Sequence, residues 1–600
     1  MTVARLKHFV PILFPVFFSL YLYRRSFRIW FLRDDFAWLG LRLSISDFSS
    51  FLAALFAPMA QGTVRFLSER AFFLGFESAF GLESLPMRIW MFLTLAAALV
   101  LLTLVAEKLT GSRWIGMAAA LFWSLNFGVS VAMSWLSSYN QILISALMLG
   151  ALYATMQGRM RWAWVCFLLG FGALESVIMI PPILLVWAWL YEREKVKAVL
   201  PMFGPAALFA AAHLWWIPKP DTGNTYKMFF DRSLLESVGI YWRWLLGAVK
   251  LSAFSPDYLW MEWPALLGGT ALLALALFLG WRKKDAAPWF GLAFSLAAMA
   301  PMLPLREHRS DYYLASGSMG IMIVFASALK LFPVEARWVL GLCLGSYLYP
   351  SFLLQRDLFE YYLESTGGAR VIVRGAMHAH ALHPNQLIVL DGISSEMFQN
   401  TVADDGLRLI SGGKLRIAPG NGVPGSPWVL SPEATRTALE KNLARIYRLE
   451  GPKLRDVTRE WEQTKGPELA GGFAPEVFAA EAAFASQFVT GWYAPAEGTR
   501  WMSGRAMVRL GGGPYGAGAT LRLRGFVPPA LGETKLRALL DKELVGEKLV
   551  APGEFVLEWP VPENWKKESV LPLWIESAKT MRPPGDGRVL SIVFGEIGVR

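Results

Sequence analysis

Long apolar runs restrict the fold of this chain more than any other feature of its sequence. Eleven runs of near-membrane length lie before residue 356, and none long enough to cross a bilayer follows it. A hydrocarbon core of about 30 Å needs roughly 20 apolar residues in a helix. The predicted fold class is therefore a polytopic α-helical membrane domain over residues 1–355, followed by a soluble region. The predicted spans lie near 9–23, 86–106, 114–133, 140–157, 162–174, 176–191, 198–216, 263–281, 287–304, 312–332 and 337–354.

The short connections between these runs predict which side of the membrane each loop faces. If the N-terminus lies inside, five short inner connections each contain Lys or Arg, as the positive-inside rule requires. They are residues 107–113, 158–161, 192–197, 282–285 and 333–337. The long loops 24–85 and 217–262 and the C-terminal region then face outward. One continuous helix over 162–191 would reverse every later loop, but the charge pattern favours two short helices with Glu175 recessed at their junction.

Net charge and cysteine content limit the classes of partner. The formal charge is +11, but the basic residues cluster at the edges of the apolar runs. This pattern is typical of topology signals and of contacts with anionic membrane lipids, and it argues against nucleic acid as a partner. Both cysteines, Cys166 and Cys343, lie inside apolar runs. We therefore expect them to pack in the core and to form no disulfide or metal site.

The soluble region is expected to divide into three parts. Residues 356–465 contain Gln386–Leu390, a run typical of a buried strand, between helix-like segments, and this pattern predicts a small α/β domain. Residues 466–486 are rich in Gly and Ala and are predicted to be a linker. Residues 487–600 are predicted to form a β-sandwich, because short alternating segments are separated by Gly- and Pro-rich turns. These segments are 505–510, 520–526, 554–559 and 589–594.

Two adjacent carboxylates, Asp34 and Asp35, follow the first predicted span directly. Neighbouring carboxylates at a membrane interface repel each other unless a positive group is bound or lies nearby. One of them can act as a general base, while the other orients the acceptor or holds a divalent metal such as Mg²⁺ or Mn²⁺. A solvated loop or a helix cap is the alternative interpretation.

Further ionisable residues lie beside later spans, where an unpaired charge is costly. Glu175 is expected to pair with a cation or to line a cavity, and an exposed loop carboxylate is the alternative. Arg306, Glu307, His308 and Arg309 follow the ninth predicted span. Two guanidinium groups at headgroup depth are suited to a lipid phosphate, which they can hold by paired hydrogen bonds. Ordinary contact with phospholipid headgroups is the alternative for this cluster.

Five short segments, in this order and spacing, are similar to a known family of enzymes. The segments are Asp34–Phe36, Thr63–Phe66, Val131–Gln141, Ala173–Ser176 with Ile180 and Pro181, and Arg306–Ser318. Over roughly residues 8–355 the chain resembles the polytopic GT-C glycosyltransferases. The resemblance is greatest to bacterial relatives of protein O-mannosyltransferases and of tetratricopeptide-linked O-mannosyltransferases.

The resemblance implies a reaction and a set of site residues. In this family an acidic residue of the first outer loop is catalytic, so either Asp34 or Asp35 would deprotonate the acceptor hydroxyl. The donor would be a sugar on a polyprenyl phosphate, transferred with inversion, and fixed guanidinium groups would stabilise the departing phosphate. The residues expected to bind the donor and its lipid phosphate are Arg65, Glu175, Arg306, Glu307, His308 and Arg309.

The resemblance also implies a setting, a multi-pass protein of a bacterial inner membrane with its C-terminal domains in the periplasm. The acceptor would be a protein, a lipid or a glycan of the cell envelope. A lipid-linked oligosaccharide polymerase or ligase is an alternative enzyme, although such an enzyme would depend on a late outer loop. A transporter or flippase for a lipid-linked sugar is the non-enzymatic alternative, and it would be expected to place charges near the bilayer midplane.

Overall fold

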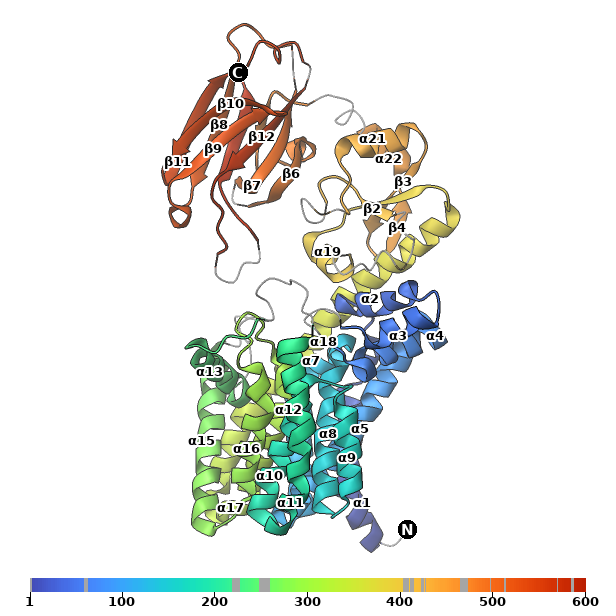
Figure 1. Cartoon of the computed structure of the whole chain (residues 1–600), viewed down its shortest axis with the longest axis vertical. Coiled ribbons are helices and arrows are strands. Elements are labelled where there is room, and N and C mark those ends of the chain that lie inside the picture. Colours follow the sequence, from blue (N-terminus) through green and yellow to red (C-terminus); the bar gives the residue numbers. More distant parts are fainter. Residues whose placement is uncertain are drawn as a thin grey trace. The chain divides into compact units, whose positions relative to one another are not determined.

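The structure is a computed structural model of the whole chain, which divides into two compact units, residues 1–367 and 368–600 (Figure 1). It describes all residues except 1–2, 59–62, 218–226, 248–258, 403–408, 410–414, 422–425, 427, 465–472, 497, 512–513, 569 and 584–587.

The first unit is helical. Its long helices run side by side, while the short helices α2, α3, α4 and α13 lie at the opposite end of this bundle from the N-terminus (Figure 1). The helices are α1 (Val3–Leu22), α2 (Asp34–Leu39), α3 (Phe48–Phe56), α4 (Phe72–Phe80), α5 (Ser84–Thr110), α6 (Arg113–Ser124), α7 (Phe127–Ser134), α8 (Tyr139–Met156), α9 (Met160–Gly170), α10 (Ile180–Tyr191), α11 (Val196–Val199), α12 (Phe203–Ala211), α13 (Ser233–Leu246), α15 (Leu259–Lys283), α16 (Ala287–Met299), α17 (Leu314–Leu331) and α18 (Arg337–Leu382), which continues into the second unit.

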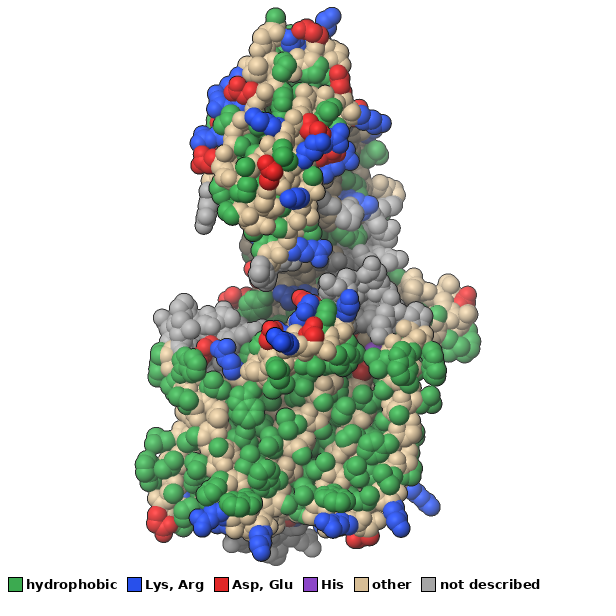
Figure 2. Space-filling view, turned by 60° about the vertical axis from the view of Figure 1, so that its left-hand side comes forward, with side chains coloured by type: hydrophobic (Ala, Val, Ile, Leu, Met, Phe, Trp, Pro, Cys, Tyr) green, Lys and Arg blue, Asp and Glu red, His purple; other side chains and the backbone are tan. Residues whose placement is uncertain are grey.

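Part of this bundle meets the requirements for crossing a membrane. Among the described residues, five helical segments are long and apolar enough, or six if the pair α6 and α7, bent by 58°, is one span. The five are Ser84–Thr110, Leu136–Met156, Arg193–Trp216, Trp260–Lys283 and Asp311–Leu331. A belt of hydrophobic side chains covers the visible face of the bundle (Figure 2). Trp215 and Trp260 are 77% and 68% exposed, which is expected for side chains that meet lipid. The chain is thus an integral membrane protein.

The segment 162–191 forms two helices, α9 and α10, with a turn and a short 3₁₀ segment between them. The apolar run 176–191 is divided, because the 3₁₀ segment Glu175–Met179 ends before α10 begins at Ile180 and is followed by Pro181 and Pro182. Both prolines lie in the first turn of α10, where a backbone N–H has no helical partner and proline is tolerated. Glu175 begins the 3₁₀ segment and so lies at the junction of the two helices.

Helices α16 and α17 are held close together by glycine. A Cβ atom on Gly291 would lie 2.6 Å from the carbonyl oxygen of Gly320, and one on Gly320 would lie 2.2 Å from that of Gly291. Ser295 also donates a hydrogen bond to the carbonyl of Gly317. Small residues that allow backbones to approach are typical of helix pairs in membranes, where lipid provides no hydrophobic force between helices.

The second unit begins with a small α/β arrangement. Its four-stranded sheet has the order β2–β1–β3–β4, with β1 parallel to both neighbours and β4 antiparallel to β3. The predicted strand at 386–390 is β1, whose Ile388 and Leu390 pack in one cluster while Val389 packs in another. The elements are β1 (Leu387–Asp391), α19 (Ser395–Thr401), β2 (Leu415–Ile417), α21 (Pro432–Glu440), β3 (Ala444–Glu450), β4 (Lys453–Asp456) and α22 (Thr458–Thr464).

The rest of the second unit is β-rich. Its strands are β5 (Glu476–Phe478), β6 (Phe488–Ala496), β7 (Thr499–Leu510), β8 (Thr520–Val527), β9 (Thr534–Leu540), β10 (Glu543–Val550), β11 (Gly553–Pro560), β12 (Leu571–Ser577) and β13 (Val593–Val599). Hydrogen bonds join all nine into one sheet in which β10 and β11 are the two end strands of the main path. A Cβ on Gly546 of β10 would lie 2.3 Å from the ring of Trp559 on β11, so the two ends meet. The nine strands thus form one curled sheet whose ends meet, and the predicted sandwich stays a prediction.

The predicted strand segments match this sheet, with one difference. Strands β7, β8 and β11 include the predicted segments 505–510, 520–526 and 554–559. The last strand, predicted at 589–594, begins only at Val593, because Leu590 forms an isolated bridge with Met581 instead. The predicted linker 466–486 lies partly outside the described residues. The further division at 356 and 487 stays a prediction.

Replacement of Gly320 by alanine tests the close contact between α16 and α17. The added methyl group has no room against the backbone of Gly291, so we expect Gly320→Ala to lower the free energy of unfolding by about 1–3 kcal/mol. Gly345→Ala on α18 is the control, because nothing lies within 4 Å of its added Cβ. Thermal unfolding in detergent measures both variants. Equal free energies of unfolding for Gly320→Ala and Gly345→Ala would contradict the close backbone contact between α16 and α17.

Candidate active site

The two carboxylates at the start of α2 face different surroundings. Asp34 is exposed, whereas Asp35 is completely buried. Arg33, which precedes them, has a φ of 53°, a conformation that is unfavourable for a residue with a side chain. Strained backbone of this kind persists only where the surroundings impose it, and it is common at functional sites. The two predicted carboxylates thus differ in exposure and follow a strained residue.

Hydrogen bonds occupy both carboxylate oxygens of Asp35. Its Oδ1 accepts bonds from the backbone N–H and the hydroxyl of Ser137, at 2.8 and 2.6 Å, and its Oδ2 accepts one from the N–H of Leu32 at 3.1 Å. Burial raises the pKa of Asp35 to about 6, although these bonds and the charge of Arg88 act in the opposite direction. Asp35 thus ties α2 to the turn before α8, and this fixes where Asp34 points.

Arg88 also attaches the segment before α2 to the helical bundle. It is buried within α5, and its two terminal nitrogens donate to the backbone carbonyls of Met133 and Trp30, at 2.9 and 3.2 Å. Trp30 precedes α2 and Met133 lies in α7. One guanidinium therefore holds three segments that are far apart in the sequence.

Arg65 is the centre of a second group of charges. Its Nε donates to both carboxylate oxygens of Glu175, at 3.0 and 2.9 Å, and its Nη1 lies 2.7 Å from Glu69. Glu175 is therefore paired, as its recessed position led us to expect. Arg65 immediately precedes the π-helical turn Phe66–Ala71, an irregularity that is frequent at functional sites. Two carboxylates thus share one guanidinium, and the charge of the neighbouring Arg70 also acts on Glu69.

Three polar residues of this region were not recognised from the sequence. Glu69 is buried, and burial raises its pKa although the charge of Arg65 acts to lower it. Asn140 donates to Glu69 at 3.3 Å, and Gln141 follows it on α8. Within the described part of the chain, Oε2 of Glu69, Oδ1 of Asn140 and both side-chain polar atoms of Gln141 are buried without a hydrogen-bond partner. Buried polar atoms of this kind are rare, and a ligand is one way to satisfy them.

One signal in the sequence was available for Glu69. It lies four residues after Arg65, and an acid and a base at this spacing face each other on a helix. Asn140 and Gln141 belong to the segment Val131–Gln141 that carries part of the family resemblance, but nothing in the sequence placed them beside Glu69.

The cluster after the ninth predicted span is divided. His308 lies 3.0 Å from the hydroxyl of Tyr312, and its pKa is lowered to about 4 by burial and by the charge of Arg65. Tyr312 in turn lies within electrostatic range of both Arg65 and Asp34, and its ring contacts Trp135. His308 therefore joins the group around Arg65.

Arg306 and Arg309 do not contact that group. Arg306 pairs with Glu307 at 2.9 Å and lies over the ring of Phe229 at 3.8 Å. Arg309 bonds to Ser237 at 3.1 Å and to Glu236 at 3.3 Å, both on α13. Among the described residues, the ion-pair partners of Arg65 and of the two later arginines are therefore different, and their joint binding of one phosphate stays a prediction.

The residues near Asp34 and Asp35 fit a metal ion poorly. Three donors and Arg88 surround the carboxylate of Asp35, and a divalent cation needs free oxygen ligands. In the described part of the chain, no group of three His, Cys, Asp or Glu side chains is arranged to hold a metal ion. The possible Mg²⁺ or Mn²⁺ site is therefore not supported by this geometry.

Comparison with known proteins gives no close relative. No protein-family model and no curated protein matches the sequence. Two solved structures align with the chain, ArnT from Cupriavidus metallidurans bound to undecaprenyl phosphate and ArnT from the same organism in the apo state. The first is 13% identical, covers 76% of this chain and 94% of its own, and has a TM-score of 0.41. The second is 11% identical, covers 78% and 96%, and has a TM-score of 0.43.

ArnT belongs to the GT-C glycosyltransferases, the class that the sequence motifs resemble. At TM-scores below 0.5, however, the likeness carries no argument about the activity of this chain. Its function has to be inferred from its own residues.

The burial of Asp35 predicts a dependence of stability on pH. The pKa of Asp35 is about 6 in the folded chain and near 3.8 in the unfolded chain, so the folded state holds an extra proton between these values. The stability of the wild type relative to Asp35→Asn should therefore fall as the pH rises from about 4 to about 6, by roughly 3 kcal/mol, and then stay constant.

Unfolding of both proteins in detergent across this pH range measures the effect. Asp47→Asn is the control with the opposite sign, because the backbone N–H of Ser50 lowers the pKa of the exposed Asp47. The stabilisation by Asp47 should be lost as the pH falls. A stability difference between wild type and Asp35→Asn that does not change with pH would contradict the burial of a titrating Asp35.

Proposed function

We propose that the chain is a membrane glycosyltransferase that moves a sugar from a polyprenyl-phosphate carrier to an acceptor hydroxyl. One observation carries the proposal. Asp34 after the first span, Arg65 with Glu175, and His308 with Tyr312 come from three distant parts of the sequence, and they interact electrostatically in one region of an apolar bundle. Such a region offers a base for the acceptor hydroxyl and hydrogen-bonding groups for the sugar, and the apolar helices around it can contact a lipid carrier.

Asp34 is the proposed general base. It is the exposed member of the pair, whereas hydrogen bonds occupy both oxygens of Asp35. Asp34 would take the proton of the acceptor hydroxyl as its oxygen attacks the anomeric carbon. The bond from that carbon to the phosphate oxygen then breaks, and the polyprenyl phosphate leaves from the opposite face, which inverts the anomeric centre. Asp35 acts as a positioning residue through α2.

Arg306 and Arg309 are the proposed ligands of the carrier phosphate. Their side chains are 35% and 18% exposed, and their acidic partners, Glu307 and Glu236, are exposed. Guanidinium groups bind phosphate by paired hydrogen bonds and stabilise the charge that develops as it leaves. Arg65 is fully engaged with Glu69 and Glu175, so its role toward the phosphate is indirect. Glu307 would orient Arg306, and His308 would orient Tyr312.

The buried group around Arg65 is the proposed site for the sugar. Glu175 and Glu69 offer carboxylates, and Asn140 and Gln141 offer amides with atoms that have no partner in the described part of the chain. Sugar hydroxyls both donate and accept hydrogen bonds, so they can satisfy such a mixed set. This assignment extends the expected donor-site residues by Glu69, Asn140 and Gln141.

The proposed membrane arrangement keeps eleven crossings and an outward-facing site in a bacterial inner membrane. Helices α2, α3, α4 and α13 lie at one end of the bundle, away from the N-terminus, as the predicted outer loops require (Figure 1). The second unit would then be periplasmic. A protein, lipid or glycan acceptor would reach Asp34 from that side.

Replacement of Asp34 tests the proposed base. Asp34→Asn keeps the shape and removes the basic oxygen, so we expect kcat to fall by about 100-fold or more. The assay measures transfer of labelled sugar from a polyprenyl-phosphate donor in nanodiscs. Asp47→Asn, an exposed helix-capping aspartate of the same loop, should keep its activity. Full activity of Asp34→Asn would eliminate this role, and donor binding without any transfer in the wild type would favour a transporter.

Replacement of Arg309 tests the phosphate site. Arg309→Gln retains hydrogen bonding to Ser237 and loses the charge, so we expect kcat/KM for the donor to fall about tenfold or more. Arg282→Gln, in the last turn of α15, is the matched control. If the binding of polyprenyl phosphate is the same in both variants, the carrier phosphate lies elsewhere.

A further inference from the structure

A buried arginine without a counter-charge lies in the β-rich part of the second unit. Arg500 on β7 is only 6% exposed. Its Nε donates to the carbonyl of Ala479 at 2.8 Å, and its guanidinium carbon lies 4.5 Å from the ring centre of Phe488. These are its side-chain contacts within the described part of the chain, and none is with a carboxylate. Burial lowers the pKa of Arg500 to about 10, and no acidic group opposes this effect.

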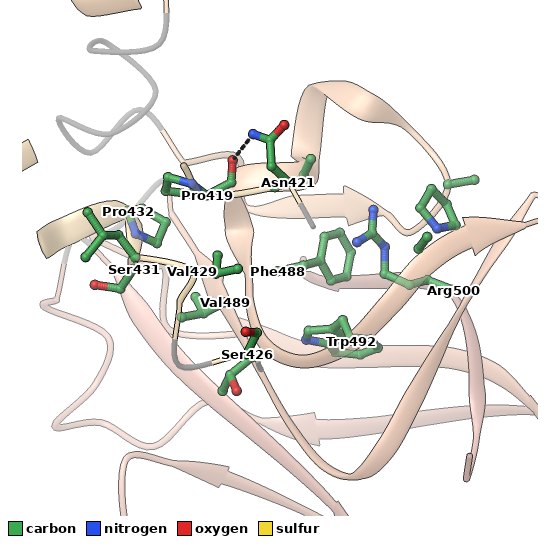
Figure 3. A pocket seen from close by; sticks show the side chains of 17 residues that line it. Pro419, Asn421, Ser426, Val429, Ser431, Pro432, Phe488, Val489, Trp492 and Arg500 are labelled. Carbon is green, nitrogen blue, oxygen red and sulfur yellow. Dashed lines mark hydrogen bonds between the residues drawn. The ribbon is translucent and has the colours of Figure 1, made fainter. Parts of the chain in front are cut away.

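A cavity of about 440 Å³ lies beside this guanidinium (Figure 3). Its volume is within the range of about 300–1,000 Å³ that is typical of sites for small molecules. Apolar side chains, Phe488 and Val489 among them, form part of the wall. Thr490 contributes a hydroxyl to the rest, whereas the amide of Asn421 is already hydrogen-bonded to Asp391, Gly392 and Ile393.

The cavity explains how Arg500 is tolerated. A buried charge without a partner costs several kcal/mol, and proteins usually pair it or omit it. Arg500 lines the cavity, so an occupant of the cavity can contact its side chain.

We propose that this pocket binds a small acidic sugar, whose carboxylate or phosphate group the terminal nitrogens of Arg500 hold. The planar guanidinium presents two parallel N–H groups that match either oxyanion. The hydroxyl of Thr490 is suited to a sugar hydroxyl, and the apolar wall is suited to the ring. This site lies wholly in the second unit and does not depend on the transfer reaction proposed for the first.

Titration calorimetry on the full chain in nanodiscs tests the proposal. The probes are glucuronic acid, glucose 6-phosphate, neutral glucose and inorganic phosphate. We expect at least one acidic sugar to bind about tenfold or more tightly than glucose and than inorganic phosphate. The two acidic sugars distinguish a carboxylate from a phosphate ligand. Binding of glucose as tight as that of the acidic sugars, or no binding of any probe, would overturn the proposal.

Two variants place the ligand in this pocket. Arg500→Met removes the charge and keeps an unbranched side chain over Phe488, so binding should fall about tenfold or more. Arg505→Met on the same strand is the matched control, because Arg505 is exposed and pairs with Glu576, and it should bind normally. Val489→Trp fills the cavity without touching the charge, and it too should abolish binding. Cooperative unfolding transitions will show that both variants are folded. If Val489→Trp and Arg500→Met then bind the acidic sugar as tightly as the wild type does, the ligand does not bind in this pocket and the proposal is overturned.

Discussion

The cost of burying charge is the constraint on which the arrangement of the helical unit depends. A charged group removed from water has to be paired or hydrogen-bonded, and this requirement is strongest in and beside a membrane. Asp35, Arg88 and Arg65 all satisfy it with partners from distant parts of the chain. Each such contact is also a constraint on geometry, because it fixes a loop against the bundle. The buried polar groups that led us to the candidate site thus also hold its loops in place.

The same constraint distinguishes two arginines of the second unit. Arg448 on β3 lies between Asp391 and Glu460, at 2.8 and 2.7 Å, and its charge is compensated within the protein. Arg500 is more deeply buried, and among the described residues it contacts one backbone carbonyl and an aromatic ring. The structural arginines of this chain have carboxylate partners, as Arg448 does, or several backbone carbonyls, as Arg88 does. The difference between Arg500 and these arginines is the reason for assigning Arg500 to a ligand.

The sequence predicted what depends on composition and on local pattern. Apolar runs placed the helices, the alternation at 505–510 placed β7, and the cost of an isolated charge predicted that Glu175 is paired. It did not predict the contacts that depend on the tertiary fold. Nothing local separates Asp34 from Asp35, and two of the three hydrogen bonds to Asp35 come from Ser137, about a hundred residues later. The partners of Arg309 on α13 were not predictable either, because they depend on how the helices pack.

The separation of Asp34 from Asp35 has a chemical consequence. Two adjacent carboxylates with equal exposure would raise each other's pKa, and neither would be a well-defined base. Here burial and three hydrogen bonds remove Asp35 from that role, and the strained backbone of Arg33 turns the chain so that Asp34 begins the helix on its exposed side. Asp34 is therefore left as the candidate base, while Asp35 supplies the fixed geometry that a proton transfer requires.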